Sequence, residues 1–299
     1  MNPPLVTFAI PAYSRPQLLA EALRSIAAQT AAVDYEVVIC DDGLREATRA
    51  LAAAFPGGRC TYLPNRPPVG AVANWNRCLG AARGRGVSVL HEDDALYPWY
   101  LATVLPRLRD GLVAVCTQTV QGAETPQLTA PSRPAAVWDY PPRYFLKSSM
   151  TPFPGVLIRR EVACRLGGFD ERWGPLADYD FWYRLACAGR VEVVRAPAAF
   201  YRVAPGQWTE RAWSRMLRLA HLLRLRIVRE QFAASPRLGL WLARFFTYRN
   251  ARAYARRFPE RTPALARALR LKKIPFSSMP SGWPWAFLKC LGRPAKRTA

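Results

Sequence analysis

The sequence is poor in histidine, in paired cysteines and in long apolar runs. His91 and His221 are the only histidines in 299 residues, so catalysis by a Ser-His or Cys-His pair has little support. The seven cysteines are scattered and lack CxxC spacing, which argues against a zinc site or a disulfide framework and favours reduced thiols in the cytoplasm. No run reaches the roughly 18 apolar residues of a spanning helix. The opening MNPPLVTFAIPAY has no basic n-region, so we expect no signal peptide.

Acidic residues are scarce too, and their distribution divides the chain. The formal net charge is +22, but residues 1–204 contain 22 Lys/Arg against 18 Asp/Glu, whereas residues 205–299 contain 21 against 3. The hydrophobic fraction of 51% is typical of a folded protein rather than a disordered one. We therefore predict a folded domain over 1–204 and a basic tail over 205–299.

Buried strands and amphipathic helices alternate in the first third of the chain. Apolar runs at 5–10, 35–40, 60–64 and 87–91 predict strands, and helical spacing predicts helices over 16–29, about 45–55 and 71–83. This order implies a parallel, helix-covered α/β sheet, in which ligands bind at the carboxyl ends of the strands. Tyr13, the pair Asp41-Asp42 and the run Glu92–Asp94 all follow such strands, so we expect one crevice to collect them.

Three adjacent acids at the end of a buried strand need a positive partner. Glu92, Asp93 and Asp94 raise one another's pKa unless a cation neutralises them, and oxygen ligands suit Mg²⁺ or Mn²⁺. The alternative is a solvated acidic turn. We predict that the catalytic site lies at this acidic run.

The rest of the chain is mixed and then helical. Residues 155–169 predict a strand and a short helix, 178–189 a helix that opens with acids, and 191–196 a strand. After Pro205 the pattern becomes helical and basic, with one apolar face made of Trp213, Met216, Leu217, Ala220, Leu223 and Ile227. The last segment, from about 274, mixes tryptophans with Lys and Arg.

Five motifs in order resemble a family 2 glycosyltransferase over about residues 5–204. They are VTFAIPAYSRPQLLAEALRSIAAQT, VVICDDG, NRPPVGAVANWNRCLGAARG, VLHEDDAL and GVLIRREVACRLGGFDERWGPLADYDFWYRLACAG. The resemblance implies an α/β GT-A nucleotide-diphospho-sugar transferase fold, with a nucleotide-binding half over 1–110 and an acceptor-binding half over 111–204. It also implies a divalent metal, Mg²⁺ or Mn²⁺, and inversion at the anomeric carbon.

The resemblance also assigns roles residue by residue. It implies donor contacts by Pro11, Tyr13, Asp41, Asp42, Arg66, Asn74 and Asp93. It implies metal binding by Asp94 and Glu92 and a general base at Asp178, with His91 a packing residue or a residue that supports the ligands rather than a ligand itself. On the acceptor side it implies Asp170, Glu171, Asp180 and Trp182, with Asp180 also the alternative base.

Several of these residues have a plain structural alternative. Tyr13 and Trp182 could be core aromatics, and Asp41 and Asp42 an Asp-Gly turn. Asn74 could be a polar residue on a helix face, and Asp178 and Asp180 could be helix caps.

Two departures from the family pattern stand out. Ala177 stands where the family has Glu before the base, and Ala204 stands at or next to the place of a His that completes the metal site. Both favour the rival hypothesis, a non-catalytic nucleotide-sugar-binding or scaffold protein that keeps the fold. The processive Gln-x-x-Arg-Trp motif is missing as well.

The predicted function is transfer of one sugar from a UDP-, dTDP- or GDP-sugar to a saccharide or lipid-linked acceptor in surface polysaccharide or glycolipid synthesis. The basic tail has three interpretations: a solvated face on a packed helical unit, an anionic membrane surface contact, or nucleic-acid binding. No nucleic-acid-binding motif supports the third. We expect a cytoplasmic protein, peripheral on the inner face of the membrane, with no nucleic-acid partner.

Overall fold

A computed structural model describes residues 4–109, 111–131, 135–150, 152–204, 207–257 and 296–297. The chain divides into two compact units. The first contains residues 1–140, 150–204 and 295–299, and the second contains 141–149 and 205–294. The predicted segment from about 274 lies almost wholly outside the described residues. The predicted boundaries at residues 110 and 204 stay predictions.

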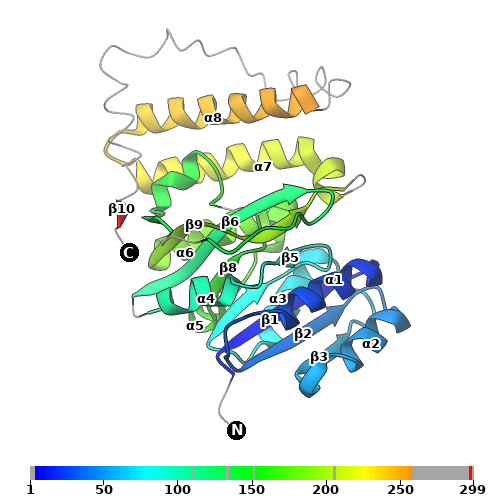
Figure 1. The fold of residues 1–299 in the computed structure, drawn as a ribbon. Helices are drawn as coiled ribbons and strands as arrows, with labels where there is room; N and C mark the ends of the chain where they lie inside the picture. The colour runs from blue at the N-terminus through cyan, green and yellow to red at the C-terminus, as the bar shows by residue number, and fades with distance from the viewer. Residues whose placement is uncertain are drawn as a thin grey trace. The chain divides into compact units, whose positions relative to one another are not determined.

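The first unit is built on a sheet whose order is β10-β7-β9-β6-β8-β4-β1-β2-β3, with β5 paired to β9 (Figure 1). Its N-terminal part is the predicted parallel sheet. The strands are β1 (Val6–Ala12), β2 (Tyr35–Asp41), β3 (Cys60–Pro64) and β4 (Gly86–Val89). The helices between them are α1 (Pro16–Ala27), α2 (Glu46–Ala53) and α3 (Ala71–Ala81). All seven predicted elements are confirmed, and the expected β-α alternation with them.

Helices lie on both faces of this parallel sheet, which is why β1 is buried along its whole length. The side chains of Phe8 and Ile10 share a core with Leu19 and Ile26 of α1. Helix α3 contacts β1 and β2. Because both faces of the sheet are covered, its buried strands are continuous apolar runs in the sequence.

The second part of the sheet is mixed. Its strands are β5 (Ala95–Leu96), β6 (Leu112–Gly122), β7 (Val137–Asp139), β8 (Val156–Arg159), β9 (Arg190–Arg202) and β10 (Lys296–Arg297). Strand β8 is antiparallel to β4 and β6, whereas β6 and β9 are parallel. The helices are α4 (Tyr100–Val104), α5 (Arg160–Arg165) and α6 (Ala177–Ala188), with 3₁₀ turns at Pro56–Gly58, Leu105–Arg107 and Glu171–Leu176.

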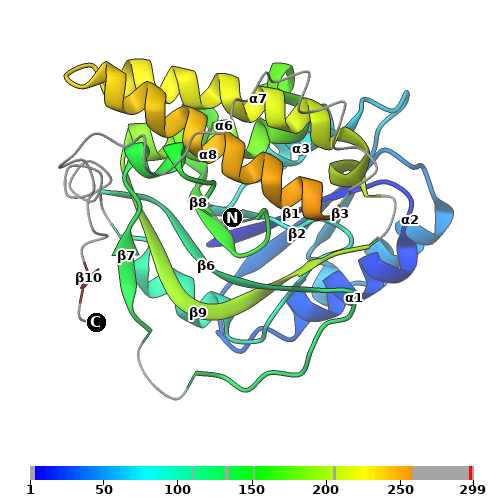
Figure 2. The same cartoon turned by 90° about the horizontal axis from the view of Figure 1, so that it is seen from above.

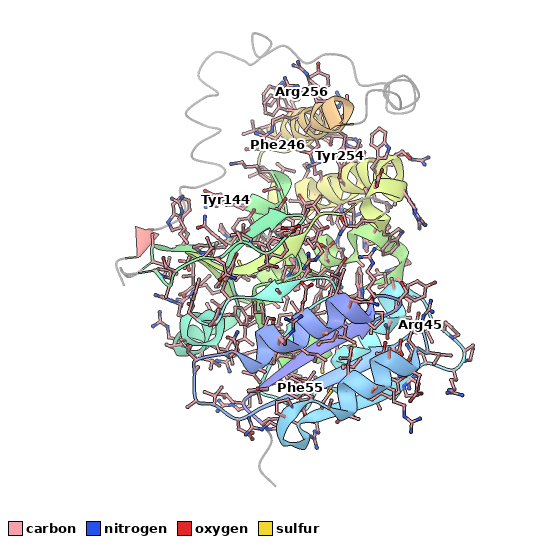
Figure 3. All side chains as sticks on the ribbon, turned by 45° about the vertical axis from the view of Figure 1, so that its right-hand side comes forward. Arg45, Phe55, Tyr144, Phe246, Tyr254 and Arg256 are labelled. Atoms are coloured by element: carbon pink, nitrogen blue, oxygen red, sulfur yellow. The ribbon has the colours of Figure 1, made fainter. Side chains whose placement is uncertain are left out.

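The described part of the second unit consists of α7 (Trp208–Gln231), α8 (Pro236–Arg257) and a 3₁₀ turn at Pro142–Leu146. Figure 2 shows α7 and α8 running side by side, and Figure 3 shows Phe246 and Tyr254 of α8 on the side toward α7. Of the predicted apolar face, five members are buried: Trp213, Leu217, Ala220, Leu223 and Ile227. Within the described residues, no helix has both the length and the apolar character that crossing a membrane requires.

Candidate functional site

The acidic run Glu92–Asp94 follows β4 and meets the chain that leaves the neighbouring β1. Glu92 does not point at its two neighbours. Its carboxylate accepts backbone N–H bonds from Tyr13 at 3.0 Å, Ser14 at 3.1 Å and Arg15 at 3.3 Å. These bonds lower its pKa, while burial, the larger effect, raises it. Glu92 therefore fixes the loop after β1, a task different from the metal binding predicted for it.

Asp94 is the most enclosed of the three acids, with 1% of its surface exposed. Its Oδ1 accepts the backbone N–H of Arg202 at 3.0 Å, whereas Oδ2 is buried and accepts no hydrogen bond from any described residue. Burial, and then the charge of Asp93, raise the pKa of Asp94 well above its usual range. A desolvated carboxylate with one unused oxygen is what a hard divalent cation requires, so this residue fits the implied metal.

Asp93 and His91 complete a group around Asp94. One ligand atom from each of the three residues lies within 4.8 Å of the others. Asp93 also forms an ion pair with Arg15, from the loop that Glu92 holds. Among the described residues, the group that could hold a metal thus contains Asp93 and Asp94 but not Glu92.

Asp41 ends β2 and is completely buried. Its oxygens accept the backbone N–H of Gly43 at 2.8 Å and of Arg45 at 3.1 Å, and the hydroxyl of Tyr62 at 2.9 Å. This is the Asp-Gly turn weighed as the alternative. Gly43 is required there, because a Cβ at this position would lie 1.3 Å from the carbonyl oxygen of Tyr13. The Tyr13 carbonyl, just after β1, is therefore in direct contact with the turn after β2.

Asp42 holds the loop that leads from β3 into α3. Its carboxylate accepts bonds from Asn65 Nδ2 at 2.6 Å and from the backbone N–H groups of Val69 at 2.9 Å and Gly70 at 2.7 Å. Asn74, 3% exposed, donates from Nδ2 to the carbonyls of Ala12 and Cys40 and so bridges the ends of β1 and β2. Asp42 and Asn74, both predicted to contact the nucleotide-sugar, are therefore buried at the carboxyl edge of the sheet and hold its loops in place.

The predicted nucleotide residues that face outward are Tyr13 and Arg66. Tyr13 is 63% exposed although it follows a fully buried strand, and Arg66 is exposed in the loop after β3. Pro11 is buried within β1. An exposed aromatic ring on a loop fixed by Glu92 is available for stacking on a planar base or ribose.

Asp178 lies in the first turn of α6 and is half-buried. Burial raises its pKa to about 6, and a bond from the Tyr179 backbone N–H at 2.7 Å opposes that rise. A carboxyl group poised near neutral pH is suited to general-base work.

Asp180, the alternative base, is completely buried and engaged elsewhere. It accepts a 2.6 Å bond from Arg184 one turn later, and Arg184 also donates to the carbonyls of Leu166 and Gly168. This ion pair ties α6 to the end of α5, so Asp180 has a structural task that Asp178 lacks.

Trp182 is completely buried in an aromatic cluster, as the core alternative predicted. Phe153 lies 5.6 Å from Trp182 and 4.3 Å from His91, between ring centroids. Trp182 stands one turn after Asp178 on α6, so a continuous set of ring contacts connects this helix with the acidic run.

The acceptor-side acids Asp170 and Glu171 lie just before α6. Asp170 is half-buried, accepts the Arg172 backbone N–H at 3.0 Å and pairs with its side chain at 2.7 Å, which lowers the pKa of Asp170. Glu171 is exposed.

Two arginines near the acids were not predicted from the sequence. Arg202 donates to Asp94 through its backbone, and its side chain donates to the carbonyls of Asp93 and Ala123 and pairs with Glu21 at 2.5 Å. Arg15 pairs with Asp93. The sequence offered one weak signal for Arg15 and Arg202: both are basic residues in a domain of low net charge.

The fold and the acids at its strand ends define a class, the GT-A glycosyltransferases. Two solved structures share the fold. One is S. aureus TarS 1-349 in complex with UDP-GlcNAc, with a TM-score of 0.59, 16% identity, and coverage of 96% of this chain and 81% of that one. The other is the mannosyltransferase PcManGT from Pyrobaculum calidifontis in complex with GDP-Man and Mn²⁺, with a TM-score of 0.56, 20% identity, and coverage of 97% and 86%.

The chain belongs to glycosyl transferase family 2, whose model matches residues 7–162. It is 31% identical over 248 residues to the succinoglycan biosynthesis protein ExoO of Rhizobium meliloti (strain 1021), covering 74% of this chain and 68% of ExoO. It is also 31% identical over 94 residues to WfgD of Escherichia coli, a UDP-Glc:alpha-D-GlcNAc-diphosphoundecaprenol beta-1,3-glucosyltransferase, covering 31% of this chain and 37% of WfgD. The chain spans about two thirds of the length of its first curated relatives, 63% of one and 68% of the other.

Proposed function

We propose that the chain transfers one sugar from a nucleotide-sugar to a saccharide or lipid-linked acceptor with inversion, in surface polysaccharide or glycolipid synthesis. The observation that carries the proposal is Asp94, a buried carboxylate with an unused oxygen beside Asp93 at the end of a parallel strand. In such sheets this edge is where ligands bind.

Asp93 and Asp94 would hold the divalent cation, Mg²⁺ or Mn²⁺. When bound, this cation supplies Lewis-acid stabilisation of negative charge on the leaving diphosphate. The chain's own contribution is to keep two carboxylates together and largely out of water, with Arg15 and Arg202 offsetting their repulsion.

The donor is a UDP-, dTDP- or GDP-sugar. Tyr13 and Arg66 contact its nucleotide, because both are exposed on loops at the edge. Asp41, Asp42 and Asn74 shape the pocket through the bonds that hold those loops. The complexes of TarS with UDP-GlcNAc and of PcManGT with GDP-Man support a nucleotide-sugar donor.

Asp178 is the general base. Its ionised carboxylate takes the proton from the acceptor hydroxyl as the hydroxyl oxygen attacks the anomeric carbon, and the sugar–phosphate bond breaks on the opposite face. A base with a pKa of about 6 is ionised at neutral pH and still a useful proton acceptor. Asp180 is excluded from this role by its ion pair with Arg184.

The acceptor is lipid-linked or saccharide, and the protein works at the cytoplasmic face of a membrane. Two features support this. WfgD, a relative over part of the chain, acts on a diphosphoundecaprenol acceptor, and α7 and α8 present exposed arginines together with the exposed Leu222 and Leu240. Exposed basic and apolar side chains on the same helices favour an anionic membrane over nucleic acid.

The test combines donor binding with turnover. Thermal shifts of the purified chain against a panel of UDP-, dTDP- and GDP-sugars with Mn²⁺ identify the donor, and a transfer assay follows with saccharide and polyprenyl-diphosphate-linked acceptors. We expect one donor class to raise the melting temperature and to be consumed in transfer. Binding without transfer across the whole acceptor panel would instead establish the non-catalytic alternative, which Ala177 and Ala204 favour.

A further inference from the structure

His91 stands directly before the acidic run, and its ring is turned into the group formed with Asp93 and Asp94. One ring nitrogen and one oxygen from each acid lie within 4.8 Å of one another. His91 Nε2 is buried and has no hydrogen-bond partner among the described residues, as is also true of Asp94 Oδ2. Two buried polar atoms left unsatisfied in one group are costly unless a common partner binds both.

The ring is fixed by packing and not by a hydrogen bond at Nε2. It stacks on Trp75 at 5.4 Å between centroids with a 28° tilt, and lies 4.3 Å from Phe153. An imidazole held by aromatic rings keeps one orientation, which is what an effective metal ligand needs.

Packing alone does not explain a histidine here. An all-carbon ring would fill the same space between Trp75 and Phe153 without leaving a buried nitrogen unsatisfied. On the other side of Asp94, the chain after Arg202 continues with Val203 and Ala204, whose side chains offer no ligand atom.

We propose that His91 binds the divalent metal through Nε2, together with carboxylate oxygens of Asp93 and Asp94. The inference rests on the proposed metal-dependent function and revises the packing role expected for His91. A nitrogen ligand among oxygens favours Mn²⁺ over Mg²⁺, because affinity for imidazole rises along the transition metals whereas Mg²⁺ prefers oxygen.

The composition of the chain makes this directly measurable, because His91 and His221 are its only histidines. Mn²⁺ alone is added to the purified chain, and pulsed electron paramagnetic resonance records nitrogen coupled to the metal. The same measurement on protein labelled with [¹⁵N]histidine needs no substitution. We expect a histidine ¹⁴N signal that becomes a ¹⁵N signal on labelling.

Variants then identify the residue. His91→Phe keeps a ring between Trp75 and Phe153, His91→Gln is a second replacement in case the first fails to fold, and His221→Asn is the matched control. We expect the nitrogen signal to vanish in both His91 variants and to persist in His221→Asn, with Mn²⁺ affinity lowered at least tenfold and Mg²⁺ affinity much less.

Three results would overturn the inference: no Mn²⁺ binding by the wild type, bound Mn²⁺ without histidine coupling, or unchanged Mn²⁺ affinity in a folded His91 variant. A transfer assay on the same samples keeps this separate from the proposed function. Wild type that transfers sugar without histidine coupling would contradict only the His91 assignment. Wild type with histidine coupling and no transfer would contradict only the enzyme.

Discussion

Asp178 and Asp180 stand two residues apart on α6 and have different tasks. Asp180 is completely buried against Arg184, whereas Asp178 has no ion pair with any described residue and burial raises its pKa to about 6. The sequence already contained this distinction, since Asp180 and Arg184 are spaced i, i+4 on a predicted helix. The role of Glu92 could not be predicted in the same way, because its partners Tyr13, Ser14 and Arg15 lie 77 to 79 residues away.

The raised pKa of Asp178 predicts an acid limb in the pH dependence of transfer. The base must be ionised, so kcat/KM should rise about tenfold per pH unit below about 6 and level off above it. Asp178→Asn should remove that limb and lower kcat by roughly 10²- to 10⁴-fold, with donor binding unchanged. The measurement is kcat/KM from pH 4.5 to 8 for both proteins, with Glu161→Gln, an exposed acid on α5, as the control. A wild-type profile that is flat through pH 6 would reject Asp178 as base.

At the scale of elements, the sequence was sufficient where hydrophobic patterns are strong. β1, β2, β3 and α3 begin and end within about two residues of their predicted limits. β1 and β2 are continuously apolar because they are buried parallel strands, and α3 buries apolar residues at helical spacing. β6 was not predicted as a strand, since only its first half is buried and Gln118–Gly122 shows no clear alternation. The bridge from α3 to the strand ends also escaped prediction, because Asn74 reads equally well as a polar residue on a helix face.

That bridge should be measurable as stability. Asn74→Ala removes the two donated bonds that join the carbonyls of Ala12 and Cys40 and leaves buried carbonyls without this partner. We expect the free energy of unfolding to fall by about 1–3 kcal/mol. Arg77→Ala, on the exposed side of the same helix, should change it by less than about 0.5 kcal/mol. Urea denaturation compares the two, and equal midpoints for both variants would show that Asn74 does not bridge these strand ends.

At the scale of the whole molecule, the candidate site is built around acids, whereas α7 and α8 carry exposed arginines. In the described residues of α7 and α8, nine arginines are exposed and Glu230 is the one exposed acid. These arginines are Arg211, Arg215, Arg218, Arg229, Arg237, Arg244, Arg249, Arg252 and Arg256. On α7 the exposed Arg211, Arg215, Arg218, Leu222 and Arg229 fall on one face, opposite the buried Leu217 and Leu223. The sequence predicted the buried face but left the partner of the exposed face open.

This exposed face predicts binding to anionic membranes. Replacing Arg211, Arg215 and Arg218 by Gln should weaken binding to vesicles that contain anionic phospholipid by about 3 kcal/mol, or roughly 100-fold. The control replaces Arg49, Arg59 and Arg77, which are exposed in the other unit and change the net charge equally. Vesicle co-sedimentation at low and high salt measures both, and binding should weaken with salt. Equal binding by the two triple variants would contradict a membrane role for this face.

The central claim is that sugar transfer depends on a cation at Asp94, and one assay tests it directly. Transfer from the identified donor is measured for wild type and Asp94→Asn after chelation, and again after Mn²⁺ is restored. We predict that chelation abolishes transfer by the wild type, that Mn²⁺ restores it, and that Asp94→Asn stays at least 100-fold slower in Mn²⁺ although it remains folded. Equal turnover by the two proteins, or full activity in the chelated wild type, would contradict the account.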